Sequence, residues 1–131
     1  MLAKQAASVD ALSGGRLVLG VAVGGREDDF AAVGADFHKR GQEFDAMLIE
    51  LEQAWAGEAI GPKGRASLII GGSVPAAFER TARHADGWIM GGGTPDMLRG
   101  GKAKTEAAWR DAGRGPPGRS RRAPSLSLIH I

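Results

Sequence analysis

Three clusters of glycine are the residues best suited to chemistry in this chain of 131 residues. Each cluster follows an apolar run: Gly24 and Gly25 follow "RLVLGVAV", Gly71 and Gly72 follow "ASLII", and residues 91–93 follow "DGWIM". Glycine at a strand end lets backbone amides approach a ligand, and the N-terminus of a following helix attracts negative charge. The stretch "IGGSVPAAF" adds the hydroxyl of Ser73. One such cluster is typical of a tight turn, whereas three together also indicate a phosphate-bearing ligand.

Other chemical signals are weak or absent. The stretch "GVAVGG" is not G-x-G-x-x-G and no G-x-x-x-x-G-K-[ST] occurs, so neither a Rossmann nor a Walker loop is indicated. His38, beside Lys39 and Arg40, and His84, beside Arg83, are interpreted as surface residues rather than catalytic bases. The chain has no cysteine, which excludes disulfides and thiolate chemistry, and no residue set has metal-ligand spacing. The sequence identifies no catalytic acid or base.

The glycine clusters must be positioned by the elements around them. Apolar spacing and turn residues predict an alternation of helices over residues 2–12, 44–55, 75–85 and 95–113 with strands over residues 16–23, 66–70 and 87–90. Such alternation is typical of an α/β fold with a parallel sheet. Ligands of these sheets bind at the carboxyl ends of the strands, where all three clusters fall.

Four local features carry their own expectations. The strand over residues 16–23 shows no alternation of apolar and polar residues, so we expect both of its faces to be buried. Ser73 is expected to cap the helix that has Pro75 in its first turn. The polar stretch "REDDFAAVGADFHKRG" is expected to be a loop with one helical turn at most. Gly100 and Gly101 are expected to interrupt the last helix.

Composition bounds the class of protein. The chain is 43% hydrophobic and 24% charged, as in an ordinary globular domain, and contains neither a membrane-length apolar run nor a signal peptide. We therefore expect a cytoplasmic protein with no membrane partner. Subtracting Arg114, Arg119, Arg121 and Arg122 from the net charge of +2 leaves −2 for the rest. This balance argues against nucleic acid as a partner.

Three segments resemble a known family. "LAKQAASVDALSGGRLVLGVAVGG", "RGQEFDAMLIELEQAW" and "SLIIGGSVPAAFERTARHADGWI" are similar to the bacterial luciferase-like monooxygenases, which are flavin- and deazaflavin-dependent oxidoreductases. The resemblance covers about residues 2–113, and its most specific parts are "LSGGR", the "GG" before a small residue and a helix, and "ADGWI". It implies a partial (β/α)8 TIM barrel of about three central strand-helix units.

The resemblance also implies a function. It implies hydride transfer through a bound cofactor, either FMN or a deazaflavin coenzyme of the F-420 type, with monooxygenation of a small-molecule substrate. The full-length form is implied to be a homo-oligomer. The loop over residues 91–94 is implied to close the rim of the site. The implied cofactor contacts are Val23, Gly24 and Gly25 along the cofactor, and Gly71, Gly72 and Ser73 at its phosphate.

The length of the chain sets a further expectation. A TIM barrel needs about 250 residues, so residues 1–113 are expected to be a fragment of a luciferase-like domain that is inactive by itself. Residues 114–131 lose the apolar patterning, and the final "LSLIHI" matches the translation of an adapter used in sequencing libraries. We expect this tail to be disordered or artefactual.

Two alternatives remain open from the sequence. The first alternative is a small non-catalytic α/β module that binds a phosphate-bearing ligand or a partner chain; ligand binding without turnover would distinguish it from the enzyme. A basic-tailed nucleic-acid binder predicts salt-dependent binding that is lost when residues 114–131 are removed. The choice between FMN and deazaflavin, the substrate and the catalytic residues are not determined by these motifs.

Overall fold

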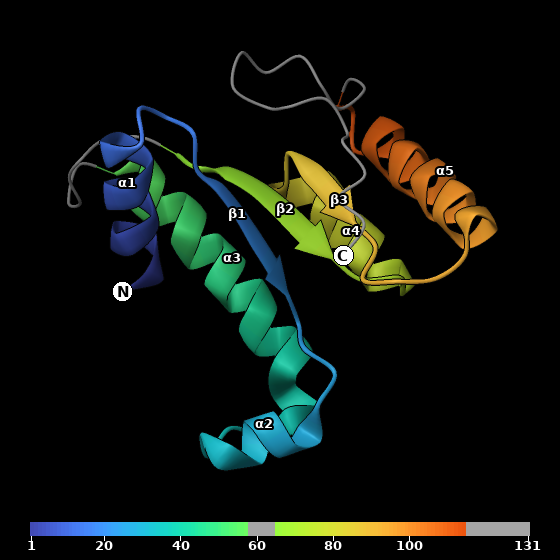
Figure 1. Ribbon diagram of the computed structural model, residues 1–131, viewed down its shortest axis with the longest axis horizontal. Coiled ribbons are helices and arrows are strands. Elements are labelled where there is room, and N and C mark those ends of the chain that lie inside the picture. Colours follow the sequence, from blue (N-terminus) through green and yellow to red (C-terminus); the bar gives the residue numbers. More distant parts are fainter. Residues whose placement is uncertain (58–64, 115–131) are drawn as a thin grey trace.

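The computed structural model describes residues 1–57 and 65–114. The predicted alternation of helices and strands is confirmed there (Figure 1). The tail over residues 115–131 lies outside the described residues. In chain order the elements are α1 (Leu2–Leu12), β1 (Val18–Ala22), α2 (Glu27–Ala32), the 3-10 helix η1 (Phe37–Lys39), α3 (Arg40–Ala56), β2 (Ser67–Gly71), α4 (Pro75–His84), β3 (Gly87–Ile89) and α5 (Pro95–Asp111).

The three strands form one parallel sheet in the order β1-β2-β3. Their register places Ala22 beside Gly71, and Gly71 beside Ile89. The three carboxyl ends therefore lie in one row, and the glycine cluster that follows each strand begins at the same edge of the sheet. This is the arrangement that the alternation of elements predicts.

The hydrophobic core lies between the sheet and the helices. Leu68 and Ile70 of β2 are fully buried against Phe44 and Leu48 of α3, together with Ala85. The two α3 residues recur at helical spacing, so they lie on one face of α3. Helix α1 packs against α3, while α4 packs on β2 and on α5. On α4 the buried residues Ala77, Phe78 and Ala82 likewise lie on one face of the helix.

The opposite face of the sheet is open. Val18, Gly20 and Ala22 of β1 are exposed, whereas Leu19 and Val21 are partly buried on the helix side. The expectation that β1 is buried on both faces was wrong. Helices cover only one face of the described sheet, and β1 stands at its edge, so every second residue of β1 meets solvent.

Helix α5 is continuous, contrary to the expectation that Gly100 and Gly101 interrupt it. Its N-cap is Thr94, whose hydroxyl oxygen accepts a hydrogen bond from the amide of Met97 at 3.3 Å. Gly101 is buried, and a Cβ there would lie 2.3 Å from Cη2 of Trp88. The glycine thus permits close packing of α5 on β3, which explains its presence inside a helix.

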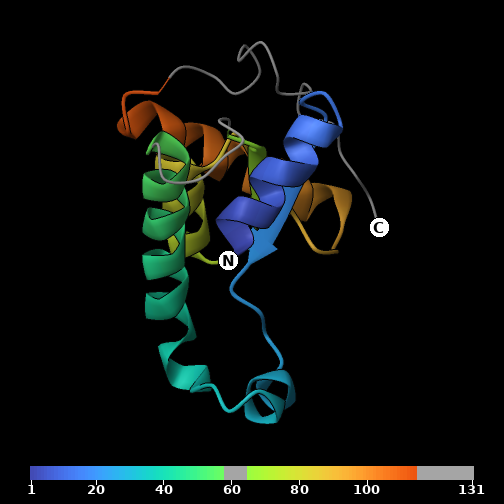
Figure 2. The ribbon, with the colours of Figure 1, turned by 90° about the vertical axis from the view of Figure 1, so that its left-hand side faces the viewer.

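The segment between β1 and α3 is more ordered than the expected loop. It contains α2 and η1, and the carboxylate of Asp36 caps η1 by accepting a hydrogen bond from the amide of His38 at 2.9 Å. The rings of Phe30 and Phe37 meet edge to face, with centroids 5.3 Å apart. In Figure 2 this segment lies below the carboxyl end of β1. It places His38 and Arg40 near the ends of the strands.

Candidate ligand-binding site

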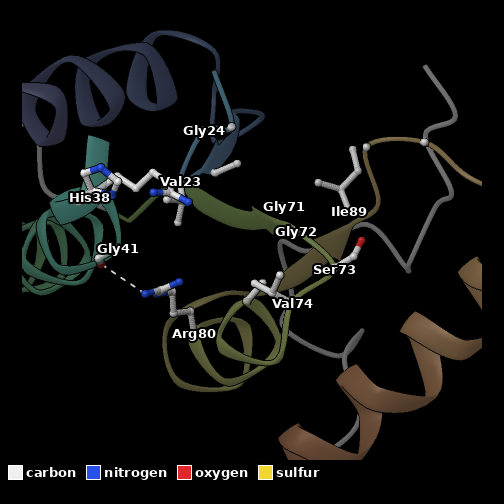
Figure 3. A pocket seen from close by; sticks show the side chains of 16 residues that line it. Val23, Gly24, His38, Gly41, Gly71, Gly72, Ser73, Val74, Arg80 and Ile89 are labelled. Atoms are coloured by element: carbon white, nitrogen blue, oxygen red, sulfur yellow. Dashed lines mark hydrogen bonds between the residues drawn. The ribbon is translucent and has the colours of Figure 1, made fainter. Parts of the chain in front are cut away.

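A pocket of about 790 Å³ opens at the carboxyl edge of the sheet (Figure 3). Its size lies within the range of ligand pockets, roughly 300–1,000 Å³. It is built from the ends of all three strands, the start of α3 and the first turns of α4. The lining residues are Ala22, Val23, Gly24, Gly25, His38, Arg40, Gly41, Gly71, Gly72, Ser73, Val74, Ala77, Arg80, Ile89, Gly91 and Gly92.

The structure brings together every cofactor contact named from the sequence. Val23, Gly24, Gly25, Gly71, Gly72 and Ser73 all line this pocket. The third glycine cluster contributes Gly91 and Gly92, whereas Gly93 and Thr94 do not line it. Because Thr94 caps α5, the rim formed by this loop ends earlier than expected.

Gly72 makes the sharp turn from β2 into α4. Its φ of +136° favours glycine, and a Cβ at this position would lie only 2.8 Å from the Cβ of Ala77. Its amide donates a long hydrogen bond of 3.4 Å to the carbonyl oxygen of Ile89, which continues the sheet by one residue. The amide of Gly72 is therefore occupied, and the role of this residue is to bring the first turn of α4 close to the strand end.

The next peptide group is oriented by Trp88. The indole Nε1 of Trp88 donates a hydrogen bond of 2.7 Å to the carbonyl oxygen of Gly72. In a planar trans peptide the C=O of one residue and the N–H of the next point in opposite directions. The N–H of Ser73 consequently points away from Trp88. Within residues 1–57 and 65–114, the amides of Ser73 and Val74 have no acceptor.

Ser73 does not cap α4, contrary to the sequence-based expectation. The N-cap is Val74, which offers no side-chain hydrogen bond, and Ser73 lies one residue earlier with an exposed side chain. Helix α4 thus begins one residue later than expected, at Pro75, so the helix does not use the Ser73 hydroxyl. The Ser73 hydroxyl and the amides of Ser73 and Val74 together form a set of donors at the N-terminus of α4. Such a set is a suitable environment for an anion.

Three basic residues of the pocket were missed as site residues. His38 is exposed, as the sequence predicted, but it lines the pocket together with Arg40 and Arg80. The signal in the sequence was weak, because only the fold places η1 and α4 on the same cavity. His84, the other histidine considered, does not line the pocket; its Nδ1 lies 3.1 Å from Oε1 of Glu52 without the alignment of a hydrogen bond.

Arg80 is held by an acidic partner on α3. Its Nε donates to Oδ1 of Asp45 at 2.5 Å, and its Nη2 donates to Oδ2 of Asp45 at 3.0 Å and to the carbonyl oxygen of Gly41 at 3.3 Å. The hydrogen bonds from Arg80 lower the pKa of Asp45, with smaller contributions from the charges of Arg80, His84 and Arg83. The pKa of Arg80 is raised by the same hydrogen bonds. Both groups therefore stay charged.

Comparison with protein families identifies the chain. Residues 1–129 match the family model of the luciferase-like monooxygenases. The chain belongs to this family. The resemblance inferred from the sequence motifs is thus confirmed. Members of this family generally use flavin-type cofactors.

Curated relatives of this luciferase-like chain occur in mycobacteria. The uncharacterized proteins Mb0965c of Mycobacterium bovis and Rv0940c of Mycobacterium tuberculosis are each 32% identical to it over 133 residues. The match covers 89% of this chain and 46% of each relative. The chain thus spans about half the length of the curated relatives it matches.

A solved structure shows the same fold. The crystal structure of monooxygenase RslO1 from Streptomyces bottropensis matches with a TM-score of 0.76 and 20% sequence identity, over 88% of this chain and 41% of that one. The three parallel strands with their helices are consistent with a part of the TIM barrel of luciferase-like proteins. The expected fold class is confirmed.

Two further features are absent from the described part of the chain. Across residues 1–57 and 65–114, no helix is both long and apolar enough to span a membrane. The same residues contain no group of three or more His, Cys, Asp or Glu side chains placed to hold a metal ion.

Proposed function

We propose that this chain contributes to a flavin- or deazaflavin-dependent oxidoreductase and binds the phosphate of FMN or of a deazaflavin at the turn between β2 and α4. The observation that carries the proposal is the Gly72 turn, after which the amides of Ser73 and Val74 have no acceptor among the described residues, in a chain of the luciferase-like family. When bound, such a cofactor supplies hydride transfer to or from a small-molecule substrate.

The residues present suit a phosphate group. The Ser73 hydroxyl and the amides of Ser73 and Val74 are donors on two consecutive residues, and the N-terminus of α4 adds its partial positive charge. Gly72 carries no Cβ that would obstruct a ligand, and Gly24 and Gly25, which follow β1, line the same pocket. The protein would thus bind and orient the cofactor, and Val23 and Ile89 would offer it apolar contacts.

A comparison of FMN with riboflavin tests this proposal. Both have the same ring, but only FMN has the phosphate, so we expect the full chain to bind FMN roughly tenfold more tightly, the equivalent of about 1.4 kcal/mol. The quenching of flavin fluorescence measures both affinities. Ser73→Ala should reduce this preference and leave riboflavin binding unchanged. Equal binding of FMN and riboflavin by the native chain would contradict the proposed phosphate site.

The non-catalytic module is the competing function. It is favoured by the open face of the sheet and by the unpaired outer edges of β1 and β3 within the described residues. Anaerobic reduction of bound flavin, followed by its reoxidation in the presence and absence of candidate substrates, separates the two functions. Flavin binding with substrate-dependent oxidation supports the enzyme, whereas phosphate or partner binding without redox turnover supports the module.

A further inference from the structure

The segment between β1 and α3 meets the pocket at both of its ends. Gly24 and Gly25 line the pocket where the segment begins, and His38 and Arg40 line it where the segment ends. The part between these ends, residues 26–39, is here called the flap and contains α2 and η1. In Figures 1 and 2 the flap projects beyond the carboxyl end of β1, which is the edge of the sheet where the pocket opens.

The flap is weakly anchored to the rest of the molecule. None of its residues is buried. Its side-chain hydrogen bonds and ion pairs with described residues have both partners within residues 26–40, as in the pairs of Arg26 with Asp28 and of Lys39 with Asp36. A unit that buries no side chain and bonds to itself separates from the body of a protein at a low cost in free energy.

The flap is nevertheless held together internally. The rings of Phe30 and Phe37 meet edge to face, and the amide of Ala35 donates a hydrogen bond of 2.9 Å to the carbonyl oxygen of Phe30. Arg40 closes the other end, because its Nη1 donates a hydrogen bond of 2.7 Å to the carbonyl oxygen of Phe37 and its Cζ lies 3.7 Å from the centroid of that ring. Loops packed by their own side chains are frequently functional. These contacts would let the flap move as one body.

Glycines form the joint between β1 and the flap. Gly24 has a φ of +84°, and a Cβ there would lie 3.2 Å from Cε2 of Phe30, so the ring rests close to the backbone of this pocket residue. A Cβ at Gly25 would meet no atom within 4 Å. Two consecutive glycines can absorb large changes of φ and ψ, which is what a hinge requires.

We propose that the flap is a lid, which swings about Gly24 and Gly25 and brings the Phe30 and Phe37 rings over a ligand in the pocket. The inference rests on the proposed function for the identity of that ligand, a flavin or deazaflavin. A closed lid excludes water from the bound cofactor, which protects hydride transfer from side reactions. The position of the flap in the structure is then the open one.

Spin labels on the full chain test the lid. The chain has no cysteine, so a label can be attached at each introduced thiol. Val33→Cys places a label on the flap, where the native side chain is 77% exposed, and Glu79→Cys places one on α4, whose first turns line the pocket. The matched control pairs Glu79→Cys with Ala46→Cys, an exposed position of α3 outside the flap. Double electron–electron resonance then gives the distance between the labels of each pair.

The lid predicts two differences between the pairs. Without ligand, the flap pair should show a broader distance distribution than the control pair, because open and closed positions coexist. Saturating FMN should shift the flap distance to shorter values and leave the control distance unchanged. If circular dichroism shows that Val33→Cys loses helix, Ala31→Cys, which is also exposed on α2, replaces it with the same expectation.

Failure of the lid can be told apart from failure of the proposed function, because flavin fluorescence measures binding separately. A flap distance that does not shorten when FMN is bound would overturn the lid. A chain that binds no FMN would contradict the proposed function. In that chain two resolved flap distances would still support the lid, whereas a single distance as narrow as that of the control pair would overturn it.

Discussion

Trp88 of β3 donates a hydrogen bond from its indole Nε1 to the carbonyl oxygen of Gly72, 2.7 Å away, and so orients the peptide whose N–H belongs to Ser73. The indole is itself fixed, since Trp88 is buried against Phe78, with ring centroids 5.7 Å apart, and against Gly101 of α5. The packing of α5 on β3 therefore holds the indole that orients the Ser73 amide, which is a donor of the candidate phosphate site.

Trp88→Phe should weaken phosphate recognition. It retains an aromatic ring but loses the Nε1 donor, so the Gly72 carbonyl loses its partner and the Ser73 amide is no longer oriented. We expect about 2 kcal/mol less stability and a several-fold smaller preference for FMN over riboflavin, measured by flavin titration. Ile70→Val is the control, because it lowers core stability by about 1 kcal/mol without touching Gly72. An unchanged FMN preference in Trp88→Phe would show that the hydrogen bond does not position the site.

Gly101→Ala and Gly100→Ala should have opposite effects on stability. Alanine favours a helix over glycine by about 1 kcal/mol, and a Cβ at Gly100 would contact no atom within 4 Å. At Gly101 the Cβ would lie 2.3 Å from Cη2 of Trp88, so either the indole or α5 must move. Urea denaturation should therefore show Gly100→Ala to be more stable than the native chain and Gly101→Ala less stable. A stabilised Gly101→Ala would contradict the close packing of α5 on β3.

Gly72→Ala should destabilise the chain by about 2 kcal/mol, because its φ of +136° strains any other residue and its new Cβ would lie 2.8 Å from that of Ala77. It should also reduce FMN binding, since the first turn of α4 must shift. Gly25→Ala is the control in the same pocket, because a Cβ there meets nothing within 4 Å. Thermal unfolding and flavin titration of both variants give the comparison. Equal stabilities of the two variants would argue against a steric need for glycine at Gly72.

The pair of Asp45 and Arg80 predicts a loss of stability in acid. The pKa of Asp45 is lowered in the folded chain by hydrogen bonds from Arg80, so its contribution is fully present above its ordinary pKa of 3.8 and is lost as the pH falls through the lowered value. Asp45→Asn should be less stable than the native chain at neutral pH, and the difference should shrink below pH 3.8. Urea denaturation at several pH values measures this difference. Its persistence in strong acid would contradict an ionised Asp45 as the cause.

Local patterns in the sequence were sufficient for much of the fold. The periodic apolar residues of α3 predict its helix, since this signal acts within a few residues. The glycines that follow each apolar run predict where the strands end. A parallel sheet then brings Gly24, Gly71 and Gly91 to one edge, so the place of the candidate site followed from the sequence as well.

Tertiary structure decided the features that depend on residues far apart in the chain. The one-sided burial of β1 follows from which face the helices cover, and the close approach of Gly101 to Trp88 follows from how α5 packs; neither is encoded in a local pattern. The same holds for the ion pair that fixes Arg80 in the pocket, because Asp45 and Arg80 are 35 residues apart and meet only when α3 packs beside α4. The sequence by itself determined the elements and the row of glycines, whereas the charges that face a ligand were determined by packing.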